Sequence, residues 1–289
     1  MPVAITPDDV ASYEERGFLV VPNVLSESEL DAVRLELAEL VDKAAGVTEN
    51  DAVYDLEDSH TQAAPRVRRI KEPHAVMPSV AALVRHRGMI EILCQLIGPG
   101  VRFQTSKLNM KSAGDGSAVE WHQDWAFYPH TNDDLAAVGI MLDDVDHNNG
   151  PLCVLPGSHR GAIHDHHANG LFCGAIDPIA SPIDFSSAVE LTGSAGSMTF
   201  HHVRAVHGSA PNRSTRSRNL LLFQFAAVDA FPLVHPVDDL ARFDQMIVAG
   251  ESTIEPRLTA VPVRMPLPPA PNQGSIYENQ RAMANRFFV

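Results

Sequence analysis

The sequence predicts a mainly β protein, a β-sandwich or jelly roll flanked by helices, within a chain of 289 residues. Two observations support this class. The first hundred residues carry helix-start signals and apolar residues at helical spacing, and the pattern changes to short strand-like runs from residue 101. Glycine, proline and asparagine turns separate those runs, as in Asn148-Asn149-Gly150.

The first predicted helix begins at residue 7. Thr6 with Asp9 resembles a capping box, Pro7 occupies the first helical position, and we expect the helix to end near Gly17. Residues 17–25 then form an apolar stretch that a proline interrupts. Because proline cannot donate to a ladder of hydrogen bonds, this stretch is predicted to be an edge strand or an extended entry.

Two more helices are predicted before residue 100. Ser26 and Glu29 make a second capping box, and residues 79–97 form a third apolar helix that Gly98-Pro99-Gly100 ends. The helix after Ser26 has one apolar face, made of Leu30, Val33, Leu37, Leu40 and Val41.

Strand-like runs follow in the second part of the chain. They cover residues 103–111, 136–145, 152–156, 197–202 and 220–228.

We expect residues 1–289 to form a single domain. Residues 1–100 would be a helix-rich flank, 101–230 the jelly-roll core and 231–289 a C-terminal arm. Residues 262–275 of the arm are rich in proline. They form either an ordered surface arm or a segment that folds over the mouth of a site.

Composition and charge exclude several classes of partner. The formal net charge of −14 disfavours nucleic acid and anionic membrane, because both need a basic surface. No apolar run reaches about 18 residues, and the start of the chain does not resemble a signal peptide. The three cysteines form no CxxC pair, which favours reduced thiols and a cytoplasmic location. The sequence makes no prediction of oligomeric state.

A metal site is predicted from His122, Asp124 and His207. On an extended segment, an H-x-D triplet directs both side chains to one face, where they can reach one cation. The distal ligand is predicted at His207 rather than His201 or His202, because His207 follows an apolar strand and precedes a Gly-Ser turn. Two histidines and one carboxylate leave three positions open, which suits Fe(II) that binds a cosubstrate and O2.

Arg218 also favours His207, because it lies on the next predicted strand. A dicarboxylate cosubstrate that chelates iron at one end needs a charge partner at the other, and an arginine fork supplies a bidentate ion pair. Ser209 could add a hydrogen bond. Three other arginines in this region are predicted to be solvated surface charges: Arg204, Arg213 and Arg216. A cluster of three histidines is also predicted to lie in a solvated loop: His164, His166 and His167.

The sequence resembles the phytanoyl-CoA dioxygenase family of Fe(II)/2-oxoglutarate oxygenases over most of the chain. The resemblance lies in the segments YEERGFLVVPNVLSESEL (13–30), RIKEPH (69–74), WHQDWAFYPHTNDDL (121–135), NNGPLCVLPGSHRG (148–161) and HGSAPNRSTRSRNLLLFQF (207–225). It implies a double-stranded β-helix, or cupin-like, fold with one Fe(II), with 2-oxoglutarate and O2 as cosubstrates.

Site residues follow from the resemblance by position. His122, Asp124 and His207 are implied to be catalytic iron ligands, and Arg218 and Ser209 to hold the distal carboxylate. Four further residues are implied to lie near the cosubstrate: Asn109, Gln123, Lys71 and Lys107. For the two lysines, a structural or surface role is an equal alternative.

Three aromatic residues around the metal triplet have two interpretations. Trp125, Phe127 and Tyr128 either pack in the core, as large aromatic side chains commonly do, or line the substrate pocket.

The predicted function is a 2-oxoglutarate-dependent dioxygenase that hydroxylates a small metabolite or natural-product intermediate and releases succinate and CO2. The alternatives are a non-oxidative metal enzyme on the same barrel, such as an isomerase or hydrolase, a binding protein that has lost turnover, and an acyl-CoA hydroxylase of the same family.

Overall fold

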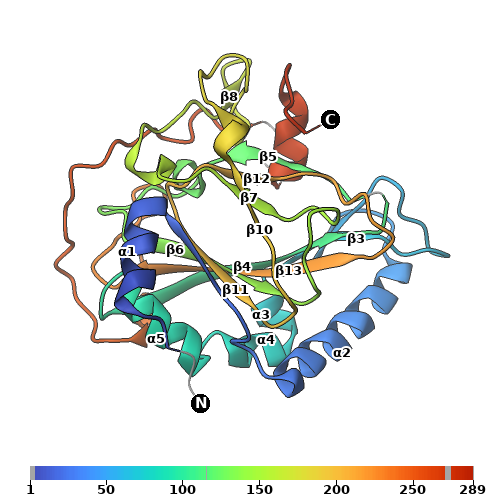
Figure 1. The fold of residues 1–289 in the computed structure, drawn as a ribbon, viewed down its shortest axis with the longest axis horizontal. Coiled ribbons are helices and arrows are strands. Elements are labelled where there is room, and N and C mark those ends of the chain that lie inside the picture. Colours follow the sequence, from blue (N-terminus) through green and yellow to red (C-terminus); the bar gives the residue numbers. More distant parts are fainter. Residues whose placement is uncertain (1–3, 115, 271–274, 289) are drawn as a thin grey trace.

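The computed structural model describes residues 4–114, 116–270 and 275–288, and two β-sheets packed face to face form its centre (Figure 1). The larger sheet has the spatial order β1 (Phe18–Val21), β11 (Met198–His202), β6 (Leu135–Met141), β13 (Arg218–Ala227), β4 (Val101–Lys111), β3 (Val67–Lys71) and β2 (Tyr54–Leu56), and β14 (Ile247–Ala249) also pairs with β4. The smaller sheet has the order β10 (Val189–Leu191), β7 (Leu152–Val154), β12 (His207–Ser209) and β5 (Val119–His122). A separate ribbon pairs β8 (His167–Ala168) with β9 (Leu171–Phe172).

Helices cover the face of the larger sheet that lies away from the smaller one (Figure 1). Their bounds are α1 (Pro7–Arg16), α2 (Glu27–Lys43), α3 (Pro73–Val76), α4 (Pro78–Leu83) and α5 (Arg87–Leu96). Two short helices come after β13, α6 (Leu240–Gln245) before β14 and α7 (Ile276–Asn279) after it. A mainly β chain with flanking helices is therefore confirmed.

Alternation along β13 divides its residues between two environments. Leu221, Phe223 and Phe225 belong to the apolar core shared with the helices. Arg218 and Gln224 are also buried, but they point to the other face, toward the smaller sheet. The candidate site therefore lies inside the sandwich, on the face of the large sheet that the helices do not cover.

The predicted start of the chain is confirmed. Thr6 and Asp9 form the capping box of α1, and the helix ends at Gly17, whose φ of 81° suits a residue without a side chain. β1 pairs with β11 and ends the described order of the larger sheet, as expected of an edge strand. The second capping box, at Ser26 and Glu29, begins α2.

The predicted helix over residues 79–97 is wrong, because the structure divides it into α4 and α5. His86 starts the second helix by accepting a hydrogen bond from Met89 N at its Nδ1 (3.1 Å). Strands β2 and β3 were not predicted within the helix-rich flank. The sequence of β3 contains basic residues at positions where a predicted strand would have apolar ones. Two of them, Arg69 and Lys71, form ion pairs with Asp55 of β2 at 2.7 and 2.9 Å.

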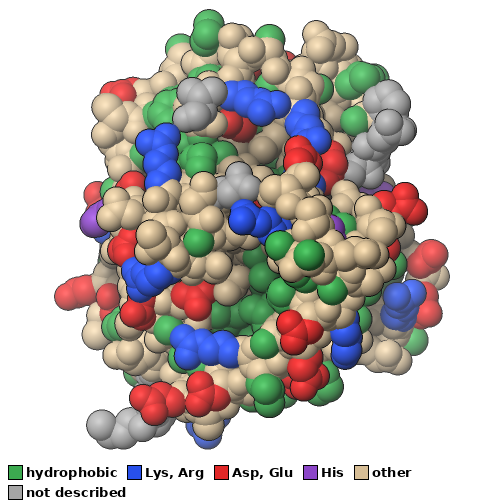
Figure 2. Space-filling view, turned by 90° about the vertical axis from the view of Figure 1, so that its right-hand side faces the viewer, with side chains coloured by type: hydrophobic (Ala, Val, Ile, Leu, Met, Phe, Trp, Pro, Cys, Tyr) green, Lys and Arg blue, Asp and Glu red, His purple; other side chains and the backbone are tan. Residues whose placement is uncertain are grey.

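None of the described helices combines the length and hydropathy needed to cross a membrane. The face shown in Figure 2 carries lysine and arginine side chains dispersed among acidic ones, with apolar side chains in the hollows between them. This face therefore presents mixed charge.

Candidate metal centre

The predicted metal triplet converges at the end of β5. His122 is the last residue of β5, Asp124 begins the short 3-10 helix Asp124–Ala126, and His207 opens β12 directly opposite His122. The strand thus ends between the two ligands instead of continuing through Asp124. Their ligand atoms, Nε2 of both histidines and a carboxylate oxygen, all lie within 4.8 Å of one another.

The protonation of the two histidines suits metal binding. Nδ1 of His122 lies 2.8 Å from Glu120 O, and Nδ1 of His207 lies 3.0 Å from Ala205 O. A carbonyl only accepts, so Nδ1 carries the proton in each ring and Nε2 keeps its lone pair for a cation. Burial lowers the pKa of His122 to about 4 and that of His207 well below its ordinary value, so both rings are neutral at pH 7.

Asp124 supplies the negative charge of the triplet. Burial opposes its ionisation, but the Lys107 ammonium and a contact with His201 hold the pKa of this carboxyl well below its usual range. Gln224 Nε2 donates to Asp124 Oδ2 at 2.9 Å and fixes the plane of the carboxylate. Two neutral imidazoles and one oriented carboxylate therefore fit a divalent transition metal.

A second buried charge lies beyond the triplet. Arg218 is 2% exposed, and its Nη2 donates to Gly150 O at 2.7 Å. Among the described residues, nothing accepts a hydrogen bond from its Nε or Nη1. Burial lowers the pKa of Arg218 only to about 10, so the guanidinium stays charged at pH 7. A buried cation with free donors indicates a site for an anion.

Ser209 and Asn109 line the same cavity as Arg218 and the triplet. Lys111 Nζ donates to Ser209 Oγ at 2.8 Å, which leaves the serine's own proton available for an anion. Asn109 Oδ1, an acceptor, is buried without a described partner, so a hydrogen bond from Asn109 to an anion would come from its Nδ2. The cavity thus places an anion site next to a metal site, which is the arrangement that a chelating dicarboxylate requires.

The sequence profile of the phytanoyl-CoA dioxygenase family matches residues 13–220. The chain belongs to this family. It is 35% identical over 280 residues to the "Probable alpha-ketoglutarate-dependent hypophosphite dioxygenase" of Stutzerimonas stutzeri, covering 96% of this chain and 97% of that protein. It is 30% identical over 250 residues to the L-proline trans-4-hydroxylase of Streptomyces griseoviridis, covering 80% and 89%.

Solved structures agree with this assignment. The non-heme alpha-ketoglutarate-dependent carbocyclase SnoK from nogalamycin biosynthesis has a TM-score of 0.64 and 25% identity, covering 82% of this chain and 90% of that one. EctD from S. alaskensis with bound Fe has a TM-score of 0.68 at 21% identity, covering 90% and 92%, and shares the jelly-roll fold. The protein is an Fe(II)- and 2-oxoglutarate-dependent dioxygenase.

Two predicted contacts do not reach the oxygenase cavity. Gln123 points the other way: its amide donates to Ala162 O and Arg204 O, and its Oε1 accepts from His164 N. Trp125 packs in a separate apolar cluster and donates from Nε1 to Pro262 O at 2.9 Å. Their polar groups are occupied by backbone, so both side chains support the site from outside.

The remaining predicted residues lie around the cavity or beside it. Lys107 lines it, with Nζ 3.9 Å from Asp124 Oδ1. Lys71 and Tyr128 line a neighbouring pocket instead. The ring of Phe127 meets that of His122 edge-on, with centroids 6.0 Å apart, and so supports a ligand.

Two residues predicted to be solvated are buried. Arg204 pairs with Asp133 at 2.8 Å, and His166 accepts from Gln123 N at 2.9 Å. Both fix the loop that backs the metal triplet, a role that their position in polar runs of sequence did not indicate.

Several residues that line the oxygenase cavity were not predicted to belong to the site, among them Tyr277 and His201, which the sequence disfavours as a metal ligand. His201 Nε2 lies 3.7 Å from Asp124 Oδ2, and neither ring nitrogen has a hydrogen-bond partner among the described residues. Strand alternation gives a signal for His201, because the neighbouring His202 must point the opposite way. Tyr277 lies in the C-terminal arm, and nothing in the local sequence connects it with the triplet.

Proposed function

We propose that this dioxygenase oxidises a small anionic substrate, using residues 1–289 as one oxygenase domain. His122, Asp124 and His207 would hold Fe(II), and Arg218 with Ser209 would hold the distal carboxylate of 2-oxoglutarate. Asn109, which lines the same cavity, would donate from Nδ2 to the carboxylate nearer the metal. The buried guanidinium, whose Nε and Nη1 have no acceptor among the described residues, supports this reading over a non-oxidative metal enzyme, which needs no dicarboxylate partner.

Iron, when bound, supplies the activation of O2 that converts 2-oxoglutarate to succinate and CO2 and transfers the second oxygen atom to the substrate. The chain's own residues orient and insulate that chemistry. Gln224 fixes the Asp124 carboxylate, and the backbone carbonyls of Glu120 and Ala205 fix the two imidazoles. Arg218, which lines the same cavity, would fix the far end of the cosubstrate.

The substrate class is inferred from a pocket that adjoins the metal cavity. This pocket has a volume of about 400 Å³, and the two cavities share Arg69, Lys107 and Leu222 in their walls. Its lining includes the basic residues Arg69, Lys71 and Lys107, and one acidic residue, Glu72. Asp55 pairs with the first two, whereas Lys107 has only Asp124 as an ion-pair partner among the described residues.

Lys107 carries the substrate proposal. A metal ion would take up the charge of Asp124 and leave the ammonium of Lys107 without a counter-ion at the junction of the two cavities. A substrate with one anionic group would replace that counter-ion and lie beside the iron. We therefore assign Lys107 to the substrate rather than to 2-oxoglutarate.

The relatives support a small anionic substrate. Hypophosphite, L-proline and ectoine, the compounds named in three of the relatives, are all small and carry an anionic oxygen group. Hypophosphite is the first compound to test, because that relative matches over nearly the whole chain. Its oxidation would consume one 2-oxoglutarate and one O2 and yield phosphite, succinate and CO2.

The test is succinate formation with Fe(II), 2-oxoglutarate and air, in a panel of hypophosphite, ectoine, L-proline and uncharged compounds of similar size. We expect stimulation by an anionic member. Lys107→Met should raise KM for that substrate about tenfold or more without changing the KM for 2-oxoglutarate, and Lys107→Arg should restore most of the affinity. Stimulation only by uncharged compounds, or an unchanged substrate KM in Lys107→Met, would contradict the proposal.

A cytoplasmic location is also proposed. Cys94, Cys153 and Cys173 are all free thiols, as is usual in a reducing compartment.

A further inference from the structure

The C-terminal helix α7 forms part of the wall of the metal cavity. Ile276 and Tyr277 line it together with Arg218 and Ser209. Helix α7 lies beyond residues 13–220, the part that matches the family profile. Its contribution to the cavity is therefore a feature of this chain that the family pattern does not assign.

The phenol of Tyr277 is a hydrogen-bond donor without an acceptor. The side chain is 2% exposed, and among the described residues no group pairs with its hydroxyl. A buried hydroxyl without a partner is destabilising, and a ligand that accepts its hydrogen removes that cost. Burial raises the pKa of Tyr277 to about 12, although Arg218 opposes that rise, so the hydroxyl keeps its proton at pH 7.

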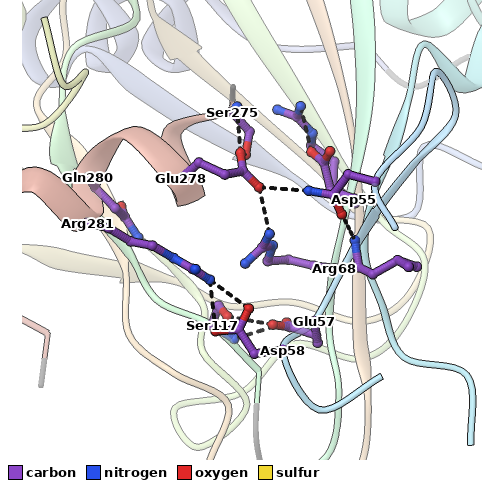
Figure 3. A network of polar contacts seen from close by, with 12 residues as sticks. Asp55, Glu57, Asp58, Arg68, Ser117, Ser275, Glu278, Gln280 and Arg281 are labelled. Atoms are coloured by element: carbon purple, nitrogen blue, oxygen red, sulfur yellow. Dashed lines mark hydrogen bonds and ion pairs between the residues drawn. The ribbon is translucent and has the colours of Figure 1, made fainter. Parts of the chain in front are cut away.

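Polar contacts of Ser275, Glu278 and Arg68 anchor α7, the helix that carries Tyr277 (Figure 3). Glu278 accepts hydrogen bonds from Ser275 at the start of α7 and forms an ion pair of 2.7 Å with Arg68 of β3. The Arg68 guanidinium lies over the Tyr277 ring, 5.2 Å from its centroid. These contacts together fix the position of the Tyr277 phenol.

A second anchor ties the segment to the strand that carries His122. Gln280 Oε1 accepts from Glu120 N, and its Nε2 donates to Ala118 O, both at 3.0 Å. Arg281 pairs with Asp58 at 2.8 Å (Figure 3). Because β5 holds both the Gln280 contact and a metal ligand, α7 and the metal site share one support.

We propose that Tyr277 donates its phenolic hydrogen to the distal carboxylate of 2-oxoglutarate, so that α7 completes the cosubstrate site. A carboxylate has four lone-pair positions, and the free donors of Arg218 and Ser209 fill up to three of them. Tyr277 lines the same cavity and lies close enough to Arg218 for each group to affect the pKa of the other, so its hydroxyl would supply another donor there. This inference rests on the proposed placement of 2-oxoglutarate at Arg218.

The experiment is an anaerobic calorimetric titration of the Fe(II)-loaded full chain with 2-oxoglutarate and with 2-oxopentanoate, which lacks the distal carboxylate. Tyr277→Phe removes only the hydroxyl. We expect its Kd for 2-oxoglutarate to rise about tenfold or more, and its Kd for 2-oxopentanoate and for Fe(II) to stay as in the wild type. Tyr13→Phe is the matched control, because Tyr13 in α1 also buries an unpaired hydroxyl but does not line the cavity.

An unchanged Kd for 2-oxoglutarate in Tyr277→Phe would overturn the inference. An equal loss for both ligands would also overturn it, because it would show a general effect on the fold of the cavity. If Tyr277→Phe does not fold, Glu278→Gln takes its place. By loosening α7 from Arg68 it should weaken 2-oxoglutarate selectively, and an unchanged affinity would again contradict the role of α7.

Arg218→Met separates this inference from the proposed function. If Arg218→Met weakens 2-oxoglutarate and Tyr277→Phe does not, only the role of Tyr277 fails. If both variants keep normal affinity, the cosubstrate does not lie at Arg218, and the proposed site fails with the inference.

Discussion

The two faces of the larger sheet differ in how well their polar groups are satisfied. Toward the helices, β13 presents Phe223 and Phe225, which pack edge-on against Phe103. Toward the smaller sheet, the same strand presents Arg218 and Gln224, each with buried polar atoms that lack a described partner. One face of β13 thus supplies apolar packing, and the other carries buried donors and acceptors that can bind ligands.

This difference indicates which part of the fold binds ligands. Buried polar groups are normally paired, so a group of unpaired ones marks a site that a ligand completes. Asn109, His201, Arg218, Gln224 and Tyr277 all have such atoms, and all lie at the metal cavity or at the pocket beside it. Substitutions on the two faces should therefore have separable effects on function and on stability.

The largest expected effect is the loss of iron in Asp124→Ala. The variant keeps two neutral imidazoles but no charge to offset a divalent cation, so we expect no stoichiometric iron and no succinate formation. Iron per chain, measured after anaerobic loading and desalting, checks this. Asp177→Ala, at a carboxylate outside the cavity lining, is the control and should keep wild-type iron. One iron per chain in Asp124→Ala would contradict the assigned ligands.

On the helix-covered face, Phe223→Ala should lower the free energy of unfolding by about 3–5 kcal/mol, because it leaves a cavity in a fully buried cluster. Urea unfolding measures this. The folded variant should keep the Kd of the wild type for 2-oxoglutarate. If its Kd for 2-oxoglutarate rises while the free energy of unfolding is unchanged, the division between the two faces is wrong.

On the cavity face, Arg218→Met should show the opposite pattern. It removes a bidentate partner of the cosubstrate, so we expect the Kd for 2-oxoglutarate to rise about a hundredfold. Unfolding of the metal-free protein should need the same free energy or up to about 2 kcal/mol more, because a buried cation without a partner has been replaced by an apolar side chain. A large loss of stability with normal cosubstrate affinity would make Arg218 a structural residue.

Histidines outside the cavity should affect stability alone. Burial lowers the pKa of His130 from 6.5 to about 4. The unfolded chain therefore takes up this proton first as the pH falls, so the stabilising contribution is complete above pH 6.5 and is lost between pH 6.5 and 4. Between pH 7 and pH 5 the expected loss is about 2 kcal/mol.

His130→Asn isolates that contribution. Between pH 7 and pH 5, the free energy of unfolding of this variant should fall by about 2 kcal/mol less than that of the wild type. Urea unfolding at the two pH values measures the difference. Equal slopes in the two proteins would show that His130 does not hold a depressed pKa.

Much of the fold was predictable because local chemistry determines it. Capping boxes at Thr6 and Ser26 begin α1 and α2, and a glycine at positive φ ends α1. Strands β2 and β3 were not predictable, since their ion pairs form only when the two strands meet. The break between α4 and α5 depends on a histidine cap, which is not a usual helix-start signal.

Some residues of the site were predictable from local sequence motifs, and others were not. The triplet and Arg218 lie in short, specific motifs, and the structure brings all four to one cavity. Gln123 stands between two ligands in sequence but points away, because its backbone is extended and neighbouring residues of an extended segment face opposite ways. Tyr277 reaches the cavity only through the tertiary contacts of α7, which leave no local pattern.

The most direct test of the whole account is a crystal structure of the protein grown anaerobically with Fe(II) and 2-oxoglutarate, with the metal located by anomalous scattering. The account predicts one iron peak within bonding distance of His122, Asp124 and His207, with the distal carboxylate of the cosubstrate on the Arg218 guanidinium. An iron peak elsewhere, or a cosubstrate whose distal carboxylate lies away from Arg218, would contradict it.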